Sequence, residues 1–354
     1  MDVRASSSGQ MRILVTGAGG FVGSLLTPRL LADGHAVRAF ARDPPRTAAA
    51  LARARSSMAL TRTAERYPPA GPAELEIIKG DALSGAGLAR ALSDVEVAYY
   101  LIHSMESPRA PSPGAGPSPW GAGPTATLAF EERERIAAHT FADAALHAGV
   151  QRIIYLGGLI GTERTPPSRH LASRREVEGI LLDAIPDTVA LRASIVIGAG
   201  SRSFRFLVRL VERMPVLTLP AWRNFRTRPI DGRDILEMLV AAACAPVAGR
   251  VLDVGGPQTL TYGEMLARIA ELMLVHRPTF ALGLSLTPLT ARVAAAIAGE
   301  DPELILRLME GLRGDLLPAN DHAEVLLGVE LHSFDSAVEH ALREWEACEP
   351  LAAR

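Results

Sequence analysis

The stretch Arg12–Gly23, RILVTGAGGFVG, constrains the fold more than any other part of the chain. A short apolar run ends in Thr16, and three glycines follow it in the pattern GxxGxxG. This pattern predicts a buried strand, a tight turn and a helix that begins near Phe21. Because the first amides of a helix are free and its amino end carries a positive dipole, the turn predicts a binding site for a diphosphate, as in a dinucleotide.

The alternation of strand and helix continues along the chain. The expected strands cover Arg12–Val15, Ala36–Phe40, Leu75–Gly80, Val97–Ile102, Arg152–Leu156 and Thr188–Ile197. Strands that are apolar on both faces and separated by helices indicate a parallel sheet covered on both sides. We therefore predict an α/β fold with a doubly wound parallel sheet of the Rossmann type. A smaller, mainly helical substrate or cap region is expected to follow it.

The same pattern predicts the domain boundaries. We expect a dinucleotide-binding domain over 11–200 and 225–256, a substrate or cap region over 201–224 and 257–350, and a disordered tail over 1–10. The segment 106–127 carries six prolines and four glycines, which excludes a regular helix or strand. It follows the fourth expected strand, at the sheet edge where such folds bind ligands. A mobile lid and a plain disordered insertion are both open interpretations.

Charge and cysteine content exclude several classes of protein. A net charge of −2 provides no general attraction to nucleic acid or anionic lipid, so we predict no nucleic-acid partner. The two cysteines, Cys244 and Cys348, lack the spacing of a disulfide framework or a zinc site. We therefore predict no metal and a reducing, cytoplasmic location.

Two segments bear on membrane targeting. The first ten residues have no apolar core, so they do not resemble a secretion signal. The most lipid-like segment, Ala281–Gly299, contains Pro288 and Arg292 in its middle. We expect this segment to be a helix packed on the protein, and no transmembrane span.

The end of the second expected strand bears on which dinucleotide binds. NAD sites place an acidic residue there to bind the ribose 2′-hydroxyl. Here Ala41 and Arg42 follow Phe40, so a guanidinium is available to bind a 2′-phosphate. We expect NADP(H), with NAD less favoured, although Asp43 next door weakens this assignment and a solvated Arg42 is the alternative. After the third strand, Asp81 either accepts from the adenine or caps a helix.

With these pieces in place the chain resembles the extended and atypical short-chain dehydrogenase/reductase families from Met11 to about Glu271. The ordered stretches that carry the likeness are TGAGGFVG, KGDAL, VEVAYYLIHSM, GVQRIIYLGGL, LRASIVIGAG, TRPIDGRDILEML and VLDVGGPQTLTYGEML. Within that superfamily the chain is most similar to bacterial NmrA-like proteins, and that branch is similar to an accessory subunit of respiratory complex I. The resemblance implies the fold more firmly than the reaction.

The resemblance also shows what this chain lacks. Catalytic members end the fifth strand in Ser or Thr and open the next helix with a YxxxK pair, whose Tyr passes a proton to the substrate. In this chain Gly157 and Gly158 replace the hydroxyl, while His170 and Arg174 take the Tyr and Lys positions. A cation one helical turn away would lower the pKa of His170 and make it a poorer base.

Site residues follow from the residues and from the resemblance together. His170, His103 and Arg174 are candidates for catalysis, although a lone His is more often structural. Trp222, Arg226 and Arg228 could bind an anionic or aromatic substrate, or Arg226 and Arg228 could form interdomain salt bridges. The expected cofactor contacts are Thr16, Gly17, Gly19, Gly20, Phe21, Val22, Gly23, Arg42, Asp81, Ala82, Leu101, Ile102, His103, Gly157, Gly158, Arg174, Ala193, Ser194 and Ile195.

Three functions remain open from the sequence. The first is an NADP(H)-dependent oxidoreductase that transfers hydride to a small enone, quinone or imine, acceptors that need little help from an acid. The second is a non-catalytic NAD(P)(H)-binding sensor or assembly factor, which the loss of the three catalytic side chains favours. The third is a non-redox isomerase or cyclase in the same pocket. Related folds often form dimers, and a homodimer is therefore one of the assembly states open to this chain.

Overall fold

The computed structural model describes residues 10–60, 74–103, 128–161, 168–281, 314–320 and 322–349, together with positions 295, 296, 299, 305, 306, 309 and 351. Its centre is a seven-stranded parallel sheet in the order β11-β6-β5-β4-β1-β2-β3. The strands are β1 (Arg12–Thr16), β2 (Ala36–Ala41), β3 (Leu75–Lys79), β4 (Val97–Tyr100), β5 (Arg152–Gly158), β6 (Val189–Ala193) and β11 (Val251–Val254). The predicted doubly wound sheet is therefore confirmed.

The last expected strand is divided in two. β6 stays in the main sheet, whereas β7 (Val196–Ile197) pairs with β10 (Ile230–Asp231). The cause lies at Ile195, whose carbonyl accepts a hydrogen bond of 2.9 Å from the Ile230 amide. The chain therefore leaves the sheet after Ala193, a break that the continuous apolar sequence does not reveal.

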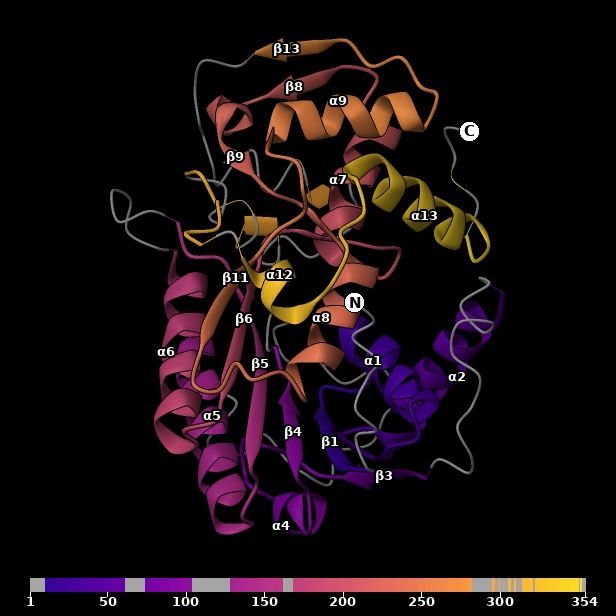
Figure 1. Cartoon of the computed structure of the whole chain (residues 1–354). Coiled ribbons are helices and arrows are strands. Elements are labelled where there is room, and N and C mark those ends of the chain that lie inside the picture. Colours follow the sequence, from indigo (N-terminus) through magenta and orange to yellow (C-terminus); the bar gives the residue numbers. More distant parts are fainter. Residues whose placement is uncertain are drawn as a thin grey trace, which may run out of the picture.

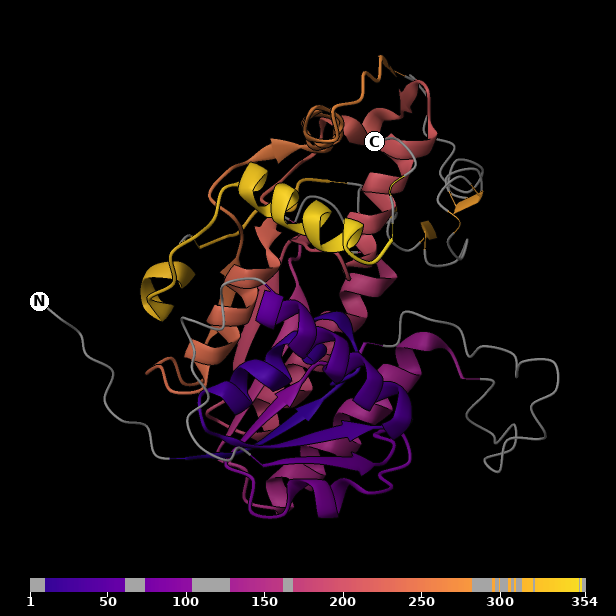
Figure 2. The same ribbon diagram turned by 90° about the vertical axis from the view of Figure 1, so that its right-hand side faces the viewer.

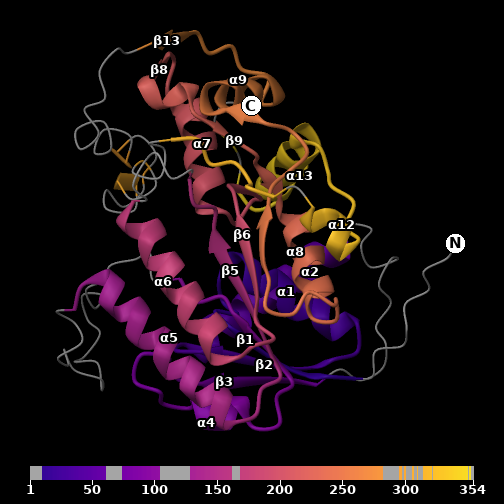
Figure 3. The same ribbon diagram turned by 60° about the vertical axis from the view of Figure 1, so that its left-hand side comes forward.

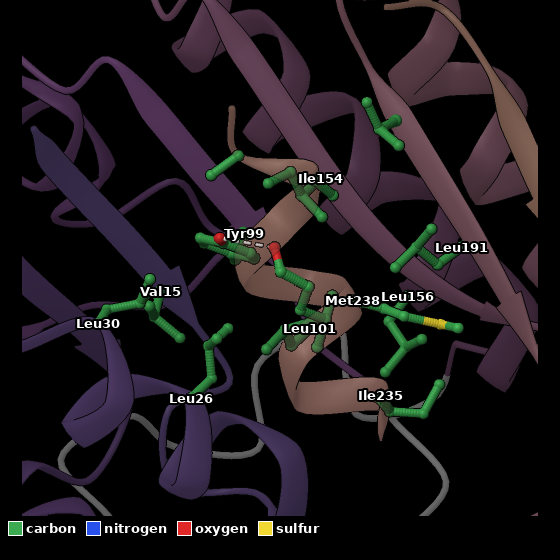
Figure 4. Close-up of a cluster of buried hydrophobic side chains, with 14 of the residues drawn as sticks. Val15, Leu26, Leu30, Tyr99, Leu101, Ile154, Leu156, Leu191, Ile235 and Met238 are labelled. Carbon is green, nitrogen blue, oxygen red and sulfur yellow. Dashed lines mark hydrogen bonds between the residues drawn. The ribbon is translucent and has the colours of Figure 1, made fainter. Parts of the chain in front are cut away.

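Helices cover both faces of the sheet (Figure 1). One face carries α1 (Phe21–Ala32), α2 (Pro44–Leu60) and α8 (Gly232–Ala242), and the other carries α4 (Leu88–Leu92), α5 (Phe130–His147) and α6 (Arg169–Ala184). Under α1 and α8 the buried side chains include Val15, Leu156 and Met238 (Figure 4). Within this core the Tyr99 hydroxyl donates to the Leu239 carbonyl over 2.9 Å, which joins β4 to α8.

A third hydrophobic core lies above the carboxyl ends of the strands (Figures 2 and 3). Its apolar residues include Phe204 and Leu207 of α7, which are buried as their helical spacing predicts, and Trp345. The elements of this region are α7 (Arg202–Arg213), β8 (Leu217–Leu219), the 3-10 helix η2 (Ala221–Asn224), β9 (Arg226–Thr227), β12 (Leu260–Thr261), α9 (Tyr262–Leu272), β13 (Thr279–Ala281) and α13 (Phe334–Glu346). The short helix α12 (Ala323–Leu327) packs instead against α8 and β11, in the core under α1 and α8.

The strand order predicts a ligand crevice between β1 and β4. The chain runs outward from β1 in one direction through β2 and β3, and in the other through β4, β5 and β6. Such a switch point opens a crevice at the carboxyl ends of the two central strands. Thr16 joins these ends, because its buried hydroxyl donates to the Tyr99 carbonyl over 2.9 Å and accepts from the Leu101 amide over 3.1 Å.

Some predictions fall on residues that the structure does not describe. The proposed lid at 106–127 lies outside the described residues, as do residues 1–9 of the expected tail and most of Ala281–Gly299. Within the described residues, no helix combines the length and the apolar character that a membrane crossing requires. Over the same part of the chain, no cluster of three or more His, Cys, Asp or Glu side chains could hold a metal ion.

Candidate active site

The glycine turn after β1 is shaped by close backbone contacts. Gly17 has a φ of 68°, and a Cβ there would lie 2.5 Å from the Leu101 carbonyl oxygen. At Gly23 a Cβ would lie 2.4 Å from the Gly17 carbonyl oxygen, so only glycine lets α1 start this close to the strand. No side chain in the described residues caps the start of α1, and the first amides of a helix have no partner within the helix itself.

Phe21, the first residue of α1, fixes the start of this helix. A Cβ at Gly198 would lie 2.4 Å from the Phe21 ring, and one at Gly200 2.6 Å from it. The ring therefore packs on the glycine-rich segment that follows β7, and a larger residue there would push the helix away. Val22 is half-buried beside it. Phe21 thus has a packing role in addition to its predicted cofactor contact.

The segments after β2 and β3 flank the same turn. A Cβ at Gly19 would lie 3.0 Å from Thr47 Oγ1, which brings the start of α2 beside the glycines. Arg42 is exposed there, whereas the Asp43 carboxylate accepts from the Arg46 amide over 3.0 Å and so caps α2. After β3, the Asp81 carboxylate accepts from the Leu83 amide over 2.9 Å, and Ala82 is buried.

Helices α5 and α6 supply a buried charged pair, Glu134 and Arg174. Ser168 caps α6 by accepting from the Leu171 amide over 3.3 Å, and Arg174 follows one and a half turns later, buried. Its guanidinium Nη1 is in hydrogen-bond contact with His103 Nδ1, and its Nη2 lies 3.7 Å from the Glu134 carboxylate. Burial lowers the pKa of Arg174 to about 9, so the group remains cationic at neutral pH.

His170 occupies a different environment from Arg174. Its half-buried ring stands 5.9 Å from the Phe130 ring, measured between centroids, and tilted by 34°. The helical spacing of His170 and Arg174 therefore does not identify the imidazole in contact with the guanidinium. That imidazole belongs to His103, which lies beyond β4 together with the half-buried Ile102 and is exposed.

The ends of β5 and β6 complete the crevice. Gly157 and Gly158 end β5, and a Cβ at Gly158 would lie 3.3 Å from the Leu171 side chain. The Ala193 carbonyl accepts from the Leu159 amide over 2.9 Å. The Ser194 hydroxyl is in hydrogen-bond contact with the Arg228 carbonyl. The two glycines therefore contribute backbone alone at the position where the resemblance implies a hydroxyl in catalytic members.

All three expected substrate residues make contacts within the protein. Arg226 binds the Asp315 carboxylate through Nε and Nη2, at 2.9 and 2.6 Å, which is the salt bridge considered as the alternative. The Arg228 Nε donates to the Gly256 carbonyl over 2.7 Å. Trp222 is half-buried, and its ring packs edge-on to that of Tyr262, 6.2 Å away between centroids.

The Arg226–Asp315 pair attaches the segment 314–320 to the site. A Cβ at Gly161, beyond β5, would lie 3.2 Å from the Asp315 carbonyl oxygen. The Leu316 amide also donates to the Arg226 carbonyl over 2.8 Å. Asp315 and Leu316 therefore lie beside the chain that leaves β5, where the sequence predicted only a general cap region.

Sequence reasoning missed Glu134 and Ser173. Glu134 is buried in α5, and its carboxylate accepts from the Ser173 hydroxyl over 2.9 Å. A signal was present, because Glu134 falls four residues after Phe130 and seven before Phe141 on the buried stripe of this helix. A carboxylate within such a stripe indicates a buried partner.

The sheet order and the glycine turn at the switch point define a Rossmann-type protein with the fold of the extended short-chain dehydrogenases/reductases. The structure is similar to UDP-glucuronic acid 4-epimerase from Bacillus cereus, solved with NAD, at a TM-score of 0.64 and 18% identity, covering 95% of this chain and 99% of that one. It is also similar to dTDP-glucose 4,6-dehydratase from Streptomyces venezuelae, at a TM-score of 0.64 and 18% identity over 96% and 98% of the two chains.

The chain belongs to the NmrA-like family, whose model matches residues 9–188. It is also 27% identical, over 152 residues, to an Arabidopsis thaliana protein named NADH dehydrogenase (ubiquinone) 1 alpha subcomplex subunit 9, mitochondrial. That match spans 42% of this chain and 37% of the length of the relative. The expected membership of this branch is confirmed.

Proposed function

We propose that this protein is an NADP(H)-dependent oxidoreductase that works without the Ser-Tyr-Lys triad. The observation that carries the proposal is the buried Arg174 cation in contact with His103 beside the crevice. Arg174 provides a fixed positive charge and hydrogen-bond donors for ribose hydroxyls. His103 provides a polar group that faces solvent. Together they supply, from different positions, what the missing Lys and Tyr supply in catalytic relatives.

The preference for NADP(H) rests on the residues after β2. Arg42 is exposed beside the glycine turn, where a 2′-phosphate would lie. The competing carboxylate of Asp43 is engaged by the Arg46 amide. The related structures named above hold NAD, so the preference for the phosphorylated cofactor is a property we assign to Arg42 in this chain.

The acceptor is an electron-poor small molecule such as an enone, a quinone or an imine. Bound NADPH supplies a hydride from its nicotinamide. In this chain Gly157 and Gly158 contribute no hydroxyl for activating a ketone, so the acceptor must take hydride with little acid assistance. We assign His103 as the group that contacts the acceptor oxygen or nitrogen, and His170 as a second candidate.

The region over 201–224 and 257–350 is proposed as the cover of this site, above a cofactor domain over 11–200 and 225–256. Its support is the separate core of α7, α9 and α13 and the attachment of residues 314–320 beside the end of β5. A cover of this size excludes water from a substrate chamber, which a simple nucleotide sensor does not need.

A second function is favoured by a specific observation. Gly157 and Gly158 provide no hydroxyl, which fits a nucleotide-binding assembly factor or sensor. The name of the Arabidopsis relative, a subunit of an NADH dehydrogenase subcomplex, fits the same function. Such a protein would bind NADPH and transfer no hydride.

The test is a titration followed by a turnover assay. Protein is titrated with NADPH and NADH, and NADPH oxidation is then followed with panels of quinones, enones and imines. We expect NADPH to bind tighter than NADH and at least one acceptor to be reduced. Binding without turnover on any acceptor would support the assembly factor, and no binding of either nucleotide would exclude both functions.

A further inference from the structure

Glu134 and Arg174 form a charged pair between two helices and the sheet. The side chains are 4% and 6% exposed, so both charges are withdrawn from water and each requires compensation by the other. They come from α5 and α6, which lie side by side (Figure 3). The Ser173 hydroxyl donates to the second carboxylate oxygen over 2.9 Å and holds it in place.

The pair determines where the guanidinium points. Nη2 faces Glu134, and the planar group then turns Nη1 toward His103. On the sheet side the Tyr155 hydroxyl donates to the Arg174 carbonyl over 3.2 Å, which fixes the backbone of this residue. Because a guanidinium is rigid and planar, positioning one nitrogen positions the other.

The contact with Arg174 also determines the protonation of His103. A guanidinium has N–H donors and no acceptor, so the imidazole nitrogen that it contacts must be unprotonated. Nη1 is nearer to Nδ1 than to Nε2, which lies 3.2 Å from it. The neutral ring then carries its single proton on Nε2. Protonation of Nδ1 would bring two N–H groups and two cations into contact.

We propose that Glu134 is a positioning residue: through Arg174 it holds His103 as the neutral imidazole with its proton on Nε2. His103 then donates a hydrogen bond to the substrate and does not act as a base. The part of this inference that concerns the substrate rests on the proposed function, whereas the tautomer of His103 does not.

The proposal narrows the substrate class. A neutral N–H donor suits a carbonyl oxygen, as in an enone or a quinone, whose developing negative charge it stabilises. An imine is reduced most readily as its cation, and a cationic substrate next to Arg174 is disfavoured by like-charge repulsion. Among the acceptors considered, quinones and enones are therefore preferred over imines.

The experiment uses the full chain labelled with ¹⁵N-histidine. NMR distinguishes protonated from bare ring nitrogens, and His103→Gln assigns the signal. In the unaltered protein we expect Nε2 protonated and Nδ1 bare. In Glu134→Gln we expect a mixture of tautomers, a quinone reductase rate at least about tenfold lower, and a smaller change in NADPH affinity. Glu131→Gln is the control, because Glu131 lies in the same helix and pairs with the exposed Arg169 over 2.8 Å.

The outcomes separate this inference from the proposed function. A proton on Nδ1 in the unaltered protein, or an unchanged tautomer in Glu134→Gln, overturns the role of Glu134. The expected tautomers in a protein that binds no nucleotide would support the positioning and exclude the oxidoreductase. If Glu134→Gln fails to fold, Ser173→Ala tests the role of Glu134 instead. This variant removes the 2.9 Å hydrogen bond to the Glu134 carboxylate and keeps both charges. Ser173→Ala must then shift the tautomer part of the way, and no shift overturns the proposal.

Discussion

The guanidinium of Arg174 contacts the imidazole of His103 across 71 positions of sequence, while His170, one turn away on the same helix, packs its ring near Phe130. This contact joins α6, the helix after β5, to the segment that follows β4. It therefore brings a buried cation and an imidazole together, although the imidazole is not that of His170, which stands at the Tyr position of the resemblance.

The buried pair of Glu134 and Arg174 leads to a prediction about stability. Arg174→Met should lower the free energy of unfolding by about 3 kcal/mol, because it leaves a buried carboxylate without its counter-ion. Adding Glu134→Leu should recover a large part of that loss, since the second charge is then removed too. Urea unfolding of the two single variants and of the double variant measures these changes in the free energy of unfolding. A double variant as unstable as the sum of the two single variants would contradict the pairing.

The contact between α1 and the turn before it leads to a second prediction. Gly23→Ala should destabilise the protein by about 2 kcal/mol and abolish most NADPH binding, because its Cβ would meet the Gly17 carbonyl oxygen at 2.4 Å. Gly179→Ala is the control, since that helical position has no atom within 4 Å of the added carbon. It should instead stabilise the protein by roughly 0.5–1 kcal/mol. Thermal unfolding and cofactor titration distinguish the two variants.

The choice of cofactor is tested at Arg42. Arg42→Ala should lower the affinity for NADPH at least about tenfold, because it removes charge-assisted hydrogen bonds to the 2′-phosphate. The affinity for NADH should change little. Arg46→Ala is the matched control, because that side chain is also exposed and lies in the first turn of α2. Fluorescence titrations with both nucleotides measure the ratio of affinities. An equal loss for the two nucleotides would rule out NADP specificity through Arg42.

The Arg226–Asp315 pair predicts a dependence of stability on pH. Burial raises the pKa of Asp315, but the hydrogen bonds and charge of Arg226 outweigh it, and the net effect lowers the pKa. A carboxylate with a lowered folded pKa contributes stability that is complete above its unfolded pKa of about 3.9 and lost as the pH falls through the folded value.

Asp315→Asn should therefore lower the free energy of unfolding by up to about 1 kcal/mol at pH 7, and by progressively less at a pH below about 4. Unfolding in urea from pH 7 down to pH 3 measures the difference. Asp94→Asn, which disrupts an exposed pair with Arg12, is the control and should change stability little at either end. A cost at Asp315 that stays constant over this range would show that the carboxylate is not held by Arg226.

The sequence by itself was sufficient for the class of fold, the glycine turn and the membership of the NmrA-like family, whereas the edge strand β11 (Val251–Val254) was not among the expected strands. These features depend on local patterns: an apolar run, a turn that only glycine can make, and helical periodicity. The burial of Phe204 and Leu207 in α7 was predictable for the same reason. The contacts of Asp43 and Asp81 are local too, because each carboxylate accepts from an amide two or three residues away. Asp81 does not cap the next helix, since the residue before α4 is Gly87.

Only the tertiary structure decided the partners of the charged groups. The Asp315 carboxylate binds Arg226, 89 positions away in sequence, and Glu134 lies beside Ser173, 39 positions away. Such contacts depend on the order of strands in the sheet and on which helices pack side by side, and neither is encoded in the spacing of the residues themselves. The split after Ala193 has the same origin, because the Ile230 amide that ends the strand comes from a distant segment.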